Sequence, residues 1–387
     1  MSLRHMLPFV LILMARQGPA LDPRLAGVND WLYILQPGAV GIEAIAASGF
    51  DGAVMDYSGD GSGATEYTPA QIASLKAAGM LVLAYLSIGE AEDYRYYWDP
   101  AWNDQPRPDP DAPPWLGPFN PQFPNNYKVR YWEPSWQAIL FGTPSGPDKS
   151  YLDRIIDQGF DGVYLDIVDA FEYWSDTRPE RTRFQARTDM ANLVAAIRNH
   201  ARVTRGVSDF LVFPQNAPAM LYDDSEQVDA LALAYLGAID GIGAEDTFYN
   251  EFTPQNQESV DYVTTLLELY RTGGGEERMV LAVDYVWNES RPDGEANKAR
   301  YNDFKSKALA RGYVPYAAVS NRDLDEILIV SPGNGLAPPQ PREDIPSGAL
   351  DTEDLLRMLQ DVANGSVGPS GLFEFAERWR GSGGMAG

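Results

Sequence analysis

The sequence contains no cysteine, which excludes disulfides, thiolate nucleophiles, zinc fingers and iron–sulfur clusters. It has only two histidines, His5 and His200. His5 belongs to the N-terminal leader, and His200 lies near the end of an expected helix, where a cation complements the helix dipole. Neither residue is placed for a Ser-His-Asp triad or for a histidine-built metal site.

Cationic residues are also scarce: the sequence has 30 Lys and Arg against 55 Asp and Glu, which gives a net charge of −25 at pH 7. A field this negative repels phosphates and argues against a nucleic-acid partner. It suits a cationic or neutral ligand, although many proteins are acidic for solubility alone. With so few histidines, the chemistry falls to carboxylates, and the sequence predicts no cofactor and no metal.

The first 20 residues are typical of a secretory signal peptide. Arg4 gives a positive start, residues 6–15 form an apolar run, and small residues at 18 and 20 offer a weak cleavage site. The run is too short to span a bilayer, and nothing after it approaches the length of a membrane-spanning helix. We therefore expect a secreted or periplasmic protein with no stable membrane span in its mature form. The alternatives for the leader are a buried strand or a membrane tether.

Strand-like and helix-like segments alternate after the leader. Thr68, Pro69 and Gly79 mark the start and the end of one helix. Several strand candidates are nearly continuous apolar runs, as in strands buried on both faces. Their number and spacing favour an α/β fold of the (β/α)8 barrel type over an open doubly wound sheet. The candidates are residues 31–36, 53–57, 80–88, 163–167, 210–213, 241–245, 279–286 and 314–319.

One motif occurs twice, as GFDGAVMDY in residues 49–57 and as GFDGVYLDI in residues 159–167. Each copy has a helix-ending glycine, a core phenylalanine, an Asp-Gly turn and a strand that ends in aspartate. A chance recurrence of a common turn is the simplest alternative. We interpret the two copies as equivalent units of one barrel.

Two segments depart from the alternation. Residues 331–387 begin with a Pro/Gly-rich linker, which leaves 21–330 for the barrel and a short C-terminal extension after it. Residues 93–149, between the third and fourth expected strands, are too rich in proline for a long helix. A loop of this length is usually functional or disordered. Its aromatic residues predict an ordered lid over the barrel mouth and, with those of 169–174, platforms for sugar rings: Trp98, Trp102, Trp115, Tyr127, Tyr131, Trp132 and Trp136.

Polar residues end most of the expected strands, where the active site of such a barrel lies. Like charges that converge at one mouth repel each other and raise each other's pKa, at a cost in stability. The cluster therefore marks a candidate site for chemistry or for a cation. Its members are Asp56, Glu90, Asp166, Asp169, Asn216, Glu245, Asp246, Asp284 and Asn321.

Two carboxyl groups are what glycoside hydrolysis needs. One protonates the leaving oxygen, while the other attacks the sugar or activates water, without histidine, metal or cofactor. Two alternatives remain at this point. One is a lectin-like barrel that binds a glycan without cutting it. The other is a carboxylate-bound metal phosphodiesterase, which normally adds His, Lys or Arg to meet phosphate.

Three runs resemble glycoside hydrolase family 114: LSIGEAEDYRYYW (86–98), NYKVRYWEPSWQ (126–137) and GFDGVYLDIVDAFEYW (159–174). They are most similar to a subgroup of that family with undefined substrates, and the resemblance covers about 29–330. It implies a (β/α)8 barrel. The characterised members are endo-α-1,4-polygalactosaminidases, so the resemblance also implies a polysaccharide substrate, with an α-1,4-linked galactosamine polymer as the first candidate.

The resemblance also implies the site residues. Asp166 matches the essential aspartate that ends the fourth strand, and Glu245 matches the glutamate that ends the sixth. By analogy with barrels that cleave α-galactosides, Asp166 is the nucleophile and Glu245 the general acid/base, provided that the two carboxyls are not more than about 6.5 Å apart. The residues predicted to bind substrate are Asp56, Tyr85, Glu90, Asp169, Glu172, Asn216, Asp284, Tyr285 and Trp132.

Overall fold

The computed structural model describes residues 21–37, 40–103, 108–143, 145–146, 148–222, 227–292, 294–331 and 335–337. The expected leader, 1–20, lies outside these ranges, as does most of the expected extension, 331–387. No helix within them combines the length and the apolar character that a membrane crossing requires.

Every one of the eight predicted strands is present, with bounds that differ from the predicted ones by a few residues. All nine residues of the seventh are buried, as expected for an apolar run covered on both faces. In chain order the strands are β1 (Trp31–Ile34), β2 (Gly52–Met55), β3 (Leu81–Ser87), β7 (Gly162–Asp166), β8 (Leu211–Pro214), β9 (Gly241–Glu245), β12 (Met279–Trp287) and β13 (Val314–Val319).

These strands form two parallel sheets, in the orders β1-β2-β3-β7-β8 and β9-β12-β13. A single parallel bridge between Gln215 and Gly243 links the end of β8 to β9. Between β1 and β13, the indole Nε1 of Trp31 donates a hydrogen bond of 3.0 Å to the carbonyl oxygen of Val314. The predicted α/β class with parallel strands is therefore confirmed.

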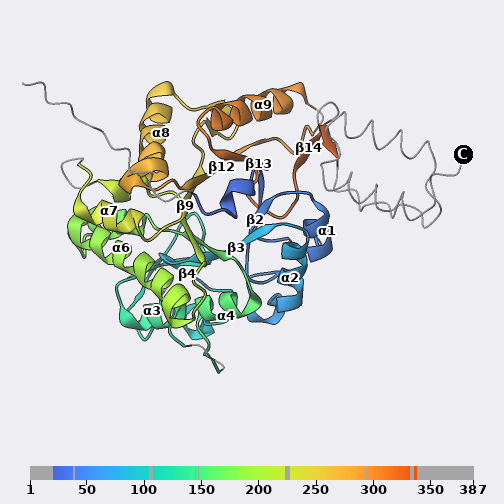
Figure 1. Cartoon of the computed structure of the whole chain (residues 1–387). Coiled ribbons are helices and arrows are strands. Elements are labelled where there is room, and N and C mark those ends of the chain that lie inside the picture. Colours follow the sequence, from blue (N-terminus) through green and yellow to red (C-terminus); the bar gives the residue numbers. More distant parts are fainter. Residues whose placement is uncertain are drawn as a thin grey trace, which may run out of the picture.

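Helices alternate with the strands and lie around the outside of the sheets (Figure 1). The predicted start of α2 is confirmed, because Thr68 caps it in a reciprocal capping box with Gln71 and Pro69 is its first residue. The helices are α1 (Ile42–Ala47), α2 (Pro69–Ala77), α3 (Pro134–Leu140), α4 (Tyr151–Gln158), α5 (Ala170–Glu172), α6 (Arg183–Asn199), α7 (Ala230–Leu236), α8 (Gln257–Thr272) and α9 (Glu295–Leu309).

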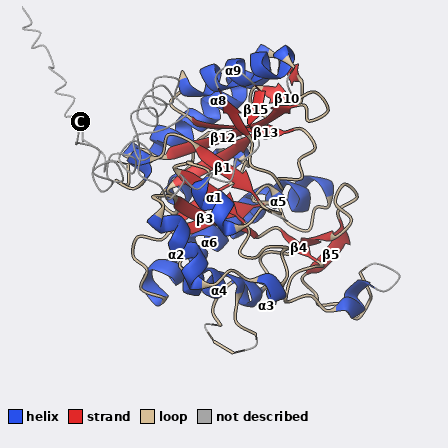
Figure 2. Cartoon of the chain, turned by 90° about the vertical axis from the view of Figure 1, so that its right-hand side faces the viewer, coloured by secondary structure: helices blue, strands red, loops and turns tan. Residues whose placement is uncertain are grey.

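The long segment between β3 and β7 has its own small sheet. Strands β4 (Glu90–Glu92), β6 (Asn126–Val129) and β5 (Leu116–Phe119) pair antiparallel in that order. They lie to one side of the central strands, near α5 (Figure 2). Short hairpins elsewhere in the described chain are formed by β10 (Tyr249–Asn250) with β11 (Thr253–Pro254), and by β14 (Ile329–Ser331) with β15 (Gly335–Ala337).

Most aromatic side chains predicted as sugar platforms in this segment are buried, so they are not open to a sugar ring. Trp115, Trp136 and five other rings of the segment and of 169–174 are at most 9% exposed. Trp102 packs on Trp98 and Trp115, with ring centroids 5.0 and 5.4 Å apart, and Trp115 packs on Trp136 at 4.9 Å. Tilted and edge-to-face packing of this kind extends the main hydrophobic core into the segment, since proline prevents long helices but not burial. The other five buried rings are Trp98, Tyr127, Tyr131, Phe171 and Trp174.

Candidate active site

The candidate active site lies at the carboxyl ends of the parallel strands. Asp166 is the last residue of β7 and Glu245 the last of β9, while Asn216 lies just beyond β8. Three residues at these ends have left-handed backbone conformations, with φ of 57° at Ile167, 55° at Asn216 and 50° at Asp246. Such conformations are unfavourable, above all for the β-branched isoleucine, and they cluster at functional sites.

Two hydrogen-bond donors hold Asp166. The Tyr85 hydroxyl donates to its Oδ2 over 2.7 Å, and the backbone N–H of Ile167 donates to Oδ1 over 2.8 Å. Within the part of the chain that the structure describes, Asp166 forms no ion pair. Burial raises the pKa of Asp166 to about 8, the Tyr85 hydrogen bond opposes this rise, and the charge of Glu245 adds to it.

Glu245 has more support for its charged form. Tyr285 donates its hydroxyl to Oε1 over 2.5 Å, and the side-chain amide of Asn216 donates to Oε2 over 3.1 Å. The Arg322 guanidinium lies over the Tyr285 ring, 4.0 Å from its centroid, and pairs with Asp246 at 2.7 Å. Burial raises the pKa of Glu245, while Tyr285, Asn216 and Arg322 oppose the rise. Asn216 and Tyr285, which the sequence predicted as substrate contacts, thus position this carboxyl.

A buried tyrosine lies near both acids. Tyr164, two residues before Asp166 on β7, is fully buried; burial raises its pKa, and the charges of Glu245 and Asp166 add to the rise. Its hydroxyl lies only 1.7 Å from the position that a Cβ on Gly243 would take. Only glycine fits at this place, two residues before Glu245. Tyr164 and Gly243 therefore fit together within the strands that end in Asp166 and Glu245, and the catalytic role of these two acids stays a prediction.

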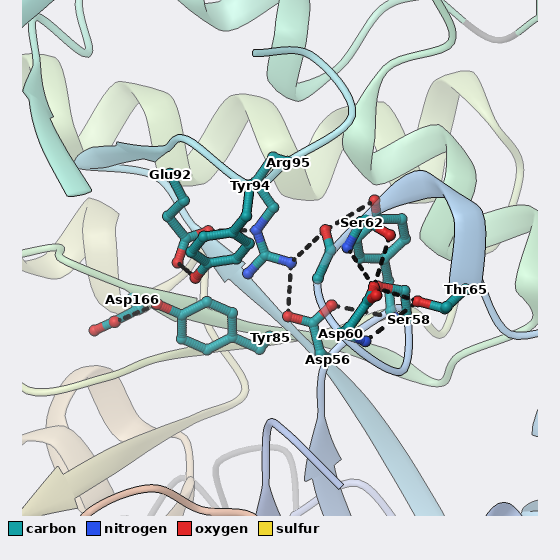
Figure 3. Close-up of polar contacts among 12 residues, drawn as sticks. Asp56, Ser58, Asp60, Ser62, Thr65, Tyr85, Glu92, Tyr94, Arg95 and Asp166 are labelled. Carbon is teal, nitrogen blue, oxygen red and sulfur yellow. Dashed lines mark hydrogen bonds and ion pairs between the residues drawn. The ribbon is translucent and has the colours of Figure 1, made fainter. Parts of the chain in front are cut away.

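Asp56 is close to Asp166 in the fold but has a different environment. Its Oδ2 pairs with the Arg95 guanidinium at 2.6 Å, and Arg95 also pairs with Glu92 at 2.5 Å (Figure 3). Burial raises the pKa of Asp56 to about 6, and Arg95 opposes the rise. Asp56 is 4% exposed. It is therefore part of a buried ion-pair network and not, as predicted, a direct contact for substrate.

Glu90 is also fully buried, contrary to a direct role in substrate binding. Its carboxyl pairs with Lys128 at 2.5 Å and accepts hydrogen bonds from Asn120 and Asn126. Asp169 differs, because solvent reaches it. Burial by the surrounding protein raises the pKa of Asp169, and Lys128 opposes the rise. A carboxyl that protein surrounds and solvent still reaches fits the predicted contact with a ligand.

Two other predicted contacts have local partners. Glu172 lies 3.5 Å from Arg183, and burial raises its pKa while Arg183 opposes the rise. Trp132 is partly buried, packs edge-on against Trp174 and carries the Arg181 guanidinium 4.2 Å from its ring centroid. The covered ring makes Trp132 a poorer sugar platform than the sequence suggested.

Asp284 supports the loop after β9 and makes no contact with solvent. Its two oxygens accept hydrogen bonds of 2.9 Å from the backbone N–H groups of Thr247, Phe248 and Tyr249. Burial raises its pKa to about 7, and the backbone donors oppose the rise. Asp284 therefore orders the chain just beyond Glu245, which corrects the prediction that it contacts substrate directly.

Sequence reasoning missed the cations of the site, Arg95, Lys128 and Arg322. Arg95 pairs with Glu92 nearby, but the pairs Arg95–Asp56, Lys128–Glu90 and Arg322–Asp246 join residues far apart in the chain, which no local pattern connects. Among the described residues, no group of three or more His, Asp or Glu side chains is arranged to hold a metal ion.

Comparisons with known proteins agree with this picture. The chain is 39% identical over 298 residues to an uncharacterised protein from Methanocaldococcus jannaschii, covering 77% of each chain. It is 38% identical over 320 residues to an uncharacterised protein from Thermotoga maritima, covering 82% of this chain and 88% of that one. The glycoside hydrolase domain of PelA from Pseudomonas aeruginosa shares the fold, with a TM-score of 0.52 and 21% identity over 78% of this chain and 98% of that chain.

The model of the glycoside-hydrolase family GH114 matches residues 16–334, most of the chain. This match confirms the resemblance that the three sequence runs indicated, and it supports glycoside hydrolase activity on a carbohydrate. The chain belongs to glycoside hydrolase family 114.

Proposed function

We propose that this protein cleaves the glycosidic bonds of a polysaccharide with Asp166 and Glu245 as its two carboxyl groups. The observation that carries the proposal is the pair itself. The two acids end strands β7 and β9, each accepts a tyrosine hydroxyl, and burial raises the pKa of both. A glycosidase needs one carboxyl that keeps its proton and one that is ionised, and environments that separate the two pKa values provide this.

The surroundings of the two acids bear on the role of each. Burial raises the pKa of Asp166 to about 8, and the charge of Glu245 adds to the rise. Burial also raises the pKa of Glu245, but Tyr285, Asn216 and the Arg322 guanidinium oppose that rise. These surroundings favour Asp166 as the proton carrier, the opposite of the split that the resemblance implies. In either split one carboxyl donates its proton to the leaving oxygen as the carbon–oxygen bond breaks. The other attacks the anomeric carbon or takes a proton from the attacking water.

We propose an α-1,4-linked galactosamine polymer as the substrate and internal, endo-type cleavage. Members of the family with this activity support the substrate, and so does the charge of the site. Asp166 and Glu245 form no ion pair within the described chain, and Asp169 reaches solvent. The whole sequence carries a net charge of −25. A protonated amino sugar gains from such a field.

The test is release of reducing ends from a polysaccharide panel that includes de-N-acetylated α-1,4-galactosaminan. We expect wild-type cleavage, and a loss of about a thousandfold in kcat for Asp166→Asn and for Glu245→Gln. Glu258→Gln, an exposed acid at the start of α8, is the matched control and keeps full activity. Cleavage that survives both site changes would show that other acids do the chemistry. Binding of a glycan without any cleavage would favour the carbohydrate-binding alternative.

Chemical rescue separates the two roles. Asp166→Gly and Glu245→Gly are assayed with an aryl glycoside in added azide. Azide that replaces a missing nucleophile gives a glycosyl azide of inverted configuration, whereas azide that replaces a missing general base gives the retained one. The inverted product from Glu245→Gly supports Glu245 as the nucleophile and Asp166 as the proton carrier. The inverted product from Asp166→Gly supports the split that the resemblance implies.

We also propose two features of the whole protein. The bridge at Gln215 and the hydrogen bond of Trp31 lie at the two places where the parallel sheets meet, which supports closure into one eight-stranded barrel. The composition of residues 1–20 supports export. N-terminal sequencing of the protein recovered from the periplasm or the medium tests export, and a start near residue 21 is the expected result.

A further inference from the structure

Tyr94, just after β4, is an exposed aromatic residue with a fixed hydroxyl. Tyr94 is 39% exposed, and its hydroxyl donates a hydrogen bond of 2.8 Å to Oε1 of Glu92. Glu92 itself is 2% exposed and is held by Arg95. The polar end of the tyrosine is therefore tied to a buried ion pair (Figure 3), while the residue as a whole stays 39% exposed.

The ring of Tyr94 is also supported from behind. The guanidinium carbon of Arg95 lies 4.9 Å from the ring centroid. Gly61 approaches so closely that a Cβ there would lie 2.6 Å from Cε2 of the ring, and its φ of +80° also requires glycine. A cation behind the ring and a bond to its hydroxyl fix the orientation before any ligand arrives. Pre-organisation of this kind lowers the entropy cost of binding.

Contacts link this ring to the candidate active site. The same guanidinium carbon of Arg95 lies 5.8 Å from the ring of Tyr85, whose hydroxyl donates to Asp166. Both rings are thus within 6 Å of one atom. The nearby Tyr96 differs, because Arg154 covers its ring at 3.8 Å and Tyr57, Tyr97 and Tyr151 pack around it.

We propose that Tyr94 is a carbohydrate-binding platform, on which the apolar face of a pyranose ring stacks in a subsite beside Asp166. The inference rests on the proposed function and adds a binding residue to it. The C–H groups of a sugar face are positively polarised, and the face of an aromatic ring is negative. A tyrosine fixed at its hydroxyl offers that face in one orientation. The contact is made in the ground state and the transition state alike, so it acts on substrate binding rather than on the chemical step.

The test compares three variants on the polysaccharide that the wild type cleaves. For Tyr94→Ala we expect a rise in KM of about tenfold with kcat changed by less than about twofold. Tyr94→Phe keeps the ring, so its KM stays within about threefold of the wild type. Tyr262→Ala removes a tyrosine that is 57% exposed on α8, and it leaves both constants unchanged. Affinity gel electrophoresis measures binding to each polysaccharide independently of cleavage, and thermal unfolding confirms that each variant is folded.

The outcomes separate this inference from the proposed function. If the wild type cleaves and Tyr94→Ala has an unchanged KM, the inference is wrong and the function stands. A loss in kcat alone also overturns the platform, because it assigns Tyr94 to positioning. If the wild type binds a polysaccharide without cleaving it and Tyr94→Ala loses that binding, the inference stands and the function does not. Absence of both binding and cleavage across the panel contradicts both.

Discussion

Two copies of one sequence motif place their aspartates in different environments in this protein. Residues 49–57 and 159–167 both begin with a left-handed glycine, with φ of 81° at Gly49 and 88° at Gly159, and both continue into a parallel strand. Asp56 and Asp166 hold the same place in the two copies. Asp56 is 4% exposed and paired with Arg95, while Asp166 is partly exposed and has hydrogen bonds from Tyr85 and its own neighbour.

The comparison shows that the partner, and not the motif, decides what the aspartate does. A guanidinium next to a buried carboxylate makes an ion pair whose disruption is costly. A carboxyl with only neutral donors keeps its proton to higher pH, which is the property that acid–base chemistry uses. The pKa of Asp56 is raised to about 6 and that of Asp166 to about 8. Tyr85 and Arg95 lie only ten residues apart, so one short segment supplies both the neutral donor to Asp166 and the cation for Asp56.

Paired substitutions give the largest expected contrast. Asp166→Asn lowers kcat by about a thousandfold and leaves the protein folded, because it removes an unneutralised carboxyl. Asp56→Asn lowers stability and reduces kcat by less than about tenfold, since the residue supports Arg95 and not the reacting atoms. Steady-state kinetics and urea unfolding of both variants are the measurements. Equal losses of activity in the two variants would contradict the assignment of Asp166 to the chemistry and of Asp56 to structural support.

Arg95→Met removes the cation that distinguishes the environment of Asp56 from that of Asp166. Without the guanidinium, Asp56 and Glu92 are left buried and unpaired, at a cost of about 3 kcal/mol in the free energy of unfolding. The loss is larger at pH 8 than at pH 5, because protonation relieves the unpaired carboxyls at low pH. Denaturant unfolding at the two pH values measures it. The control is Arg311→Met, whose arginine has no ion pair in the described chain and packs on Phe248. A cost no greater than that of the control would mean that the network is not structural.

The pH dependence of stability gives the finest comparison of the two aspartates. Between pH 4 and 8 folded wild type keeps a proton on Asp166 that the unfolded chain has lost, so this group lowers stability as pH rises. Asp166→Asn lacks the group, and its melting temperature relative to wild type rises over that whole window. For Asp56→Asn the corresponding change is complete by about pH 6. Differential scanning fluorimetry across pH measures both curves, and parallel, flat differences would contradict the assigned pKa values.

Local sequence predicted the framework well and the aromatic residues poorly. The eight parallel strands and the capped start of α2 depend on apolar runs and on neighbouring residues, and all are present. The rings of 93–149 were predicted to form a lid and sugar platforms because a loop of this length is usually functional or disordered. Most of the tryptophans and tyrosines named there are buried instead, because antiparallel β4, β5 and β6 bring distant parts of the loop together. Tyr94, which stays exposed, drew no attention among its neighbouring tyrosines.

The sequence by itself determined the strands, their alternation with helices, the absence of thiol chemistry and the acids at the strand ends, because each follows from neighbours in the chain. Only the tertiary structure decided which of those acids is neutralised. Arg95 lies 39 residues from Asp56, and Arg322 lies 76 residues from Asp246. No local pattern connects residues so far apart. A carboxyl's pKa depends on the charges and donors within a few ångströms of it, and the folding of the loops sets those neighbours.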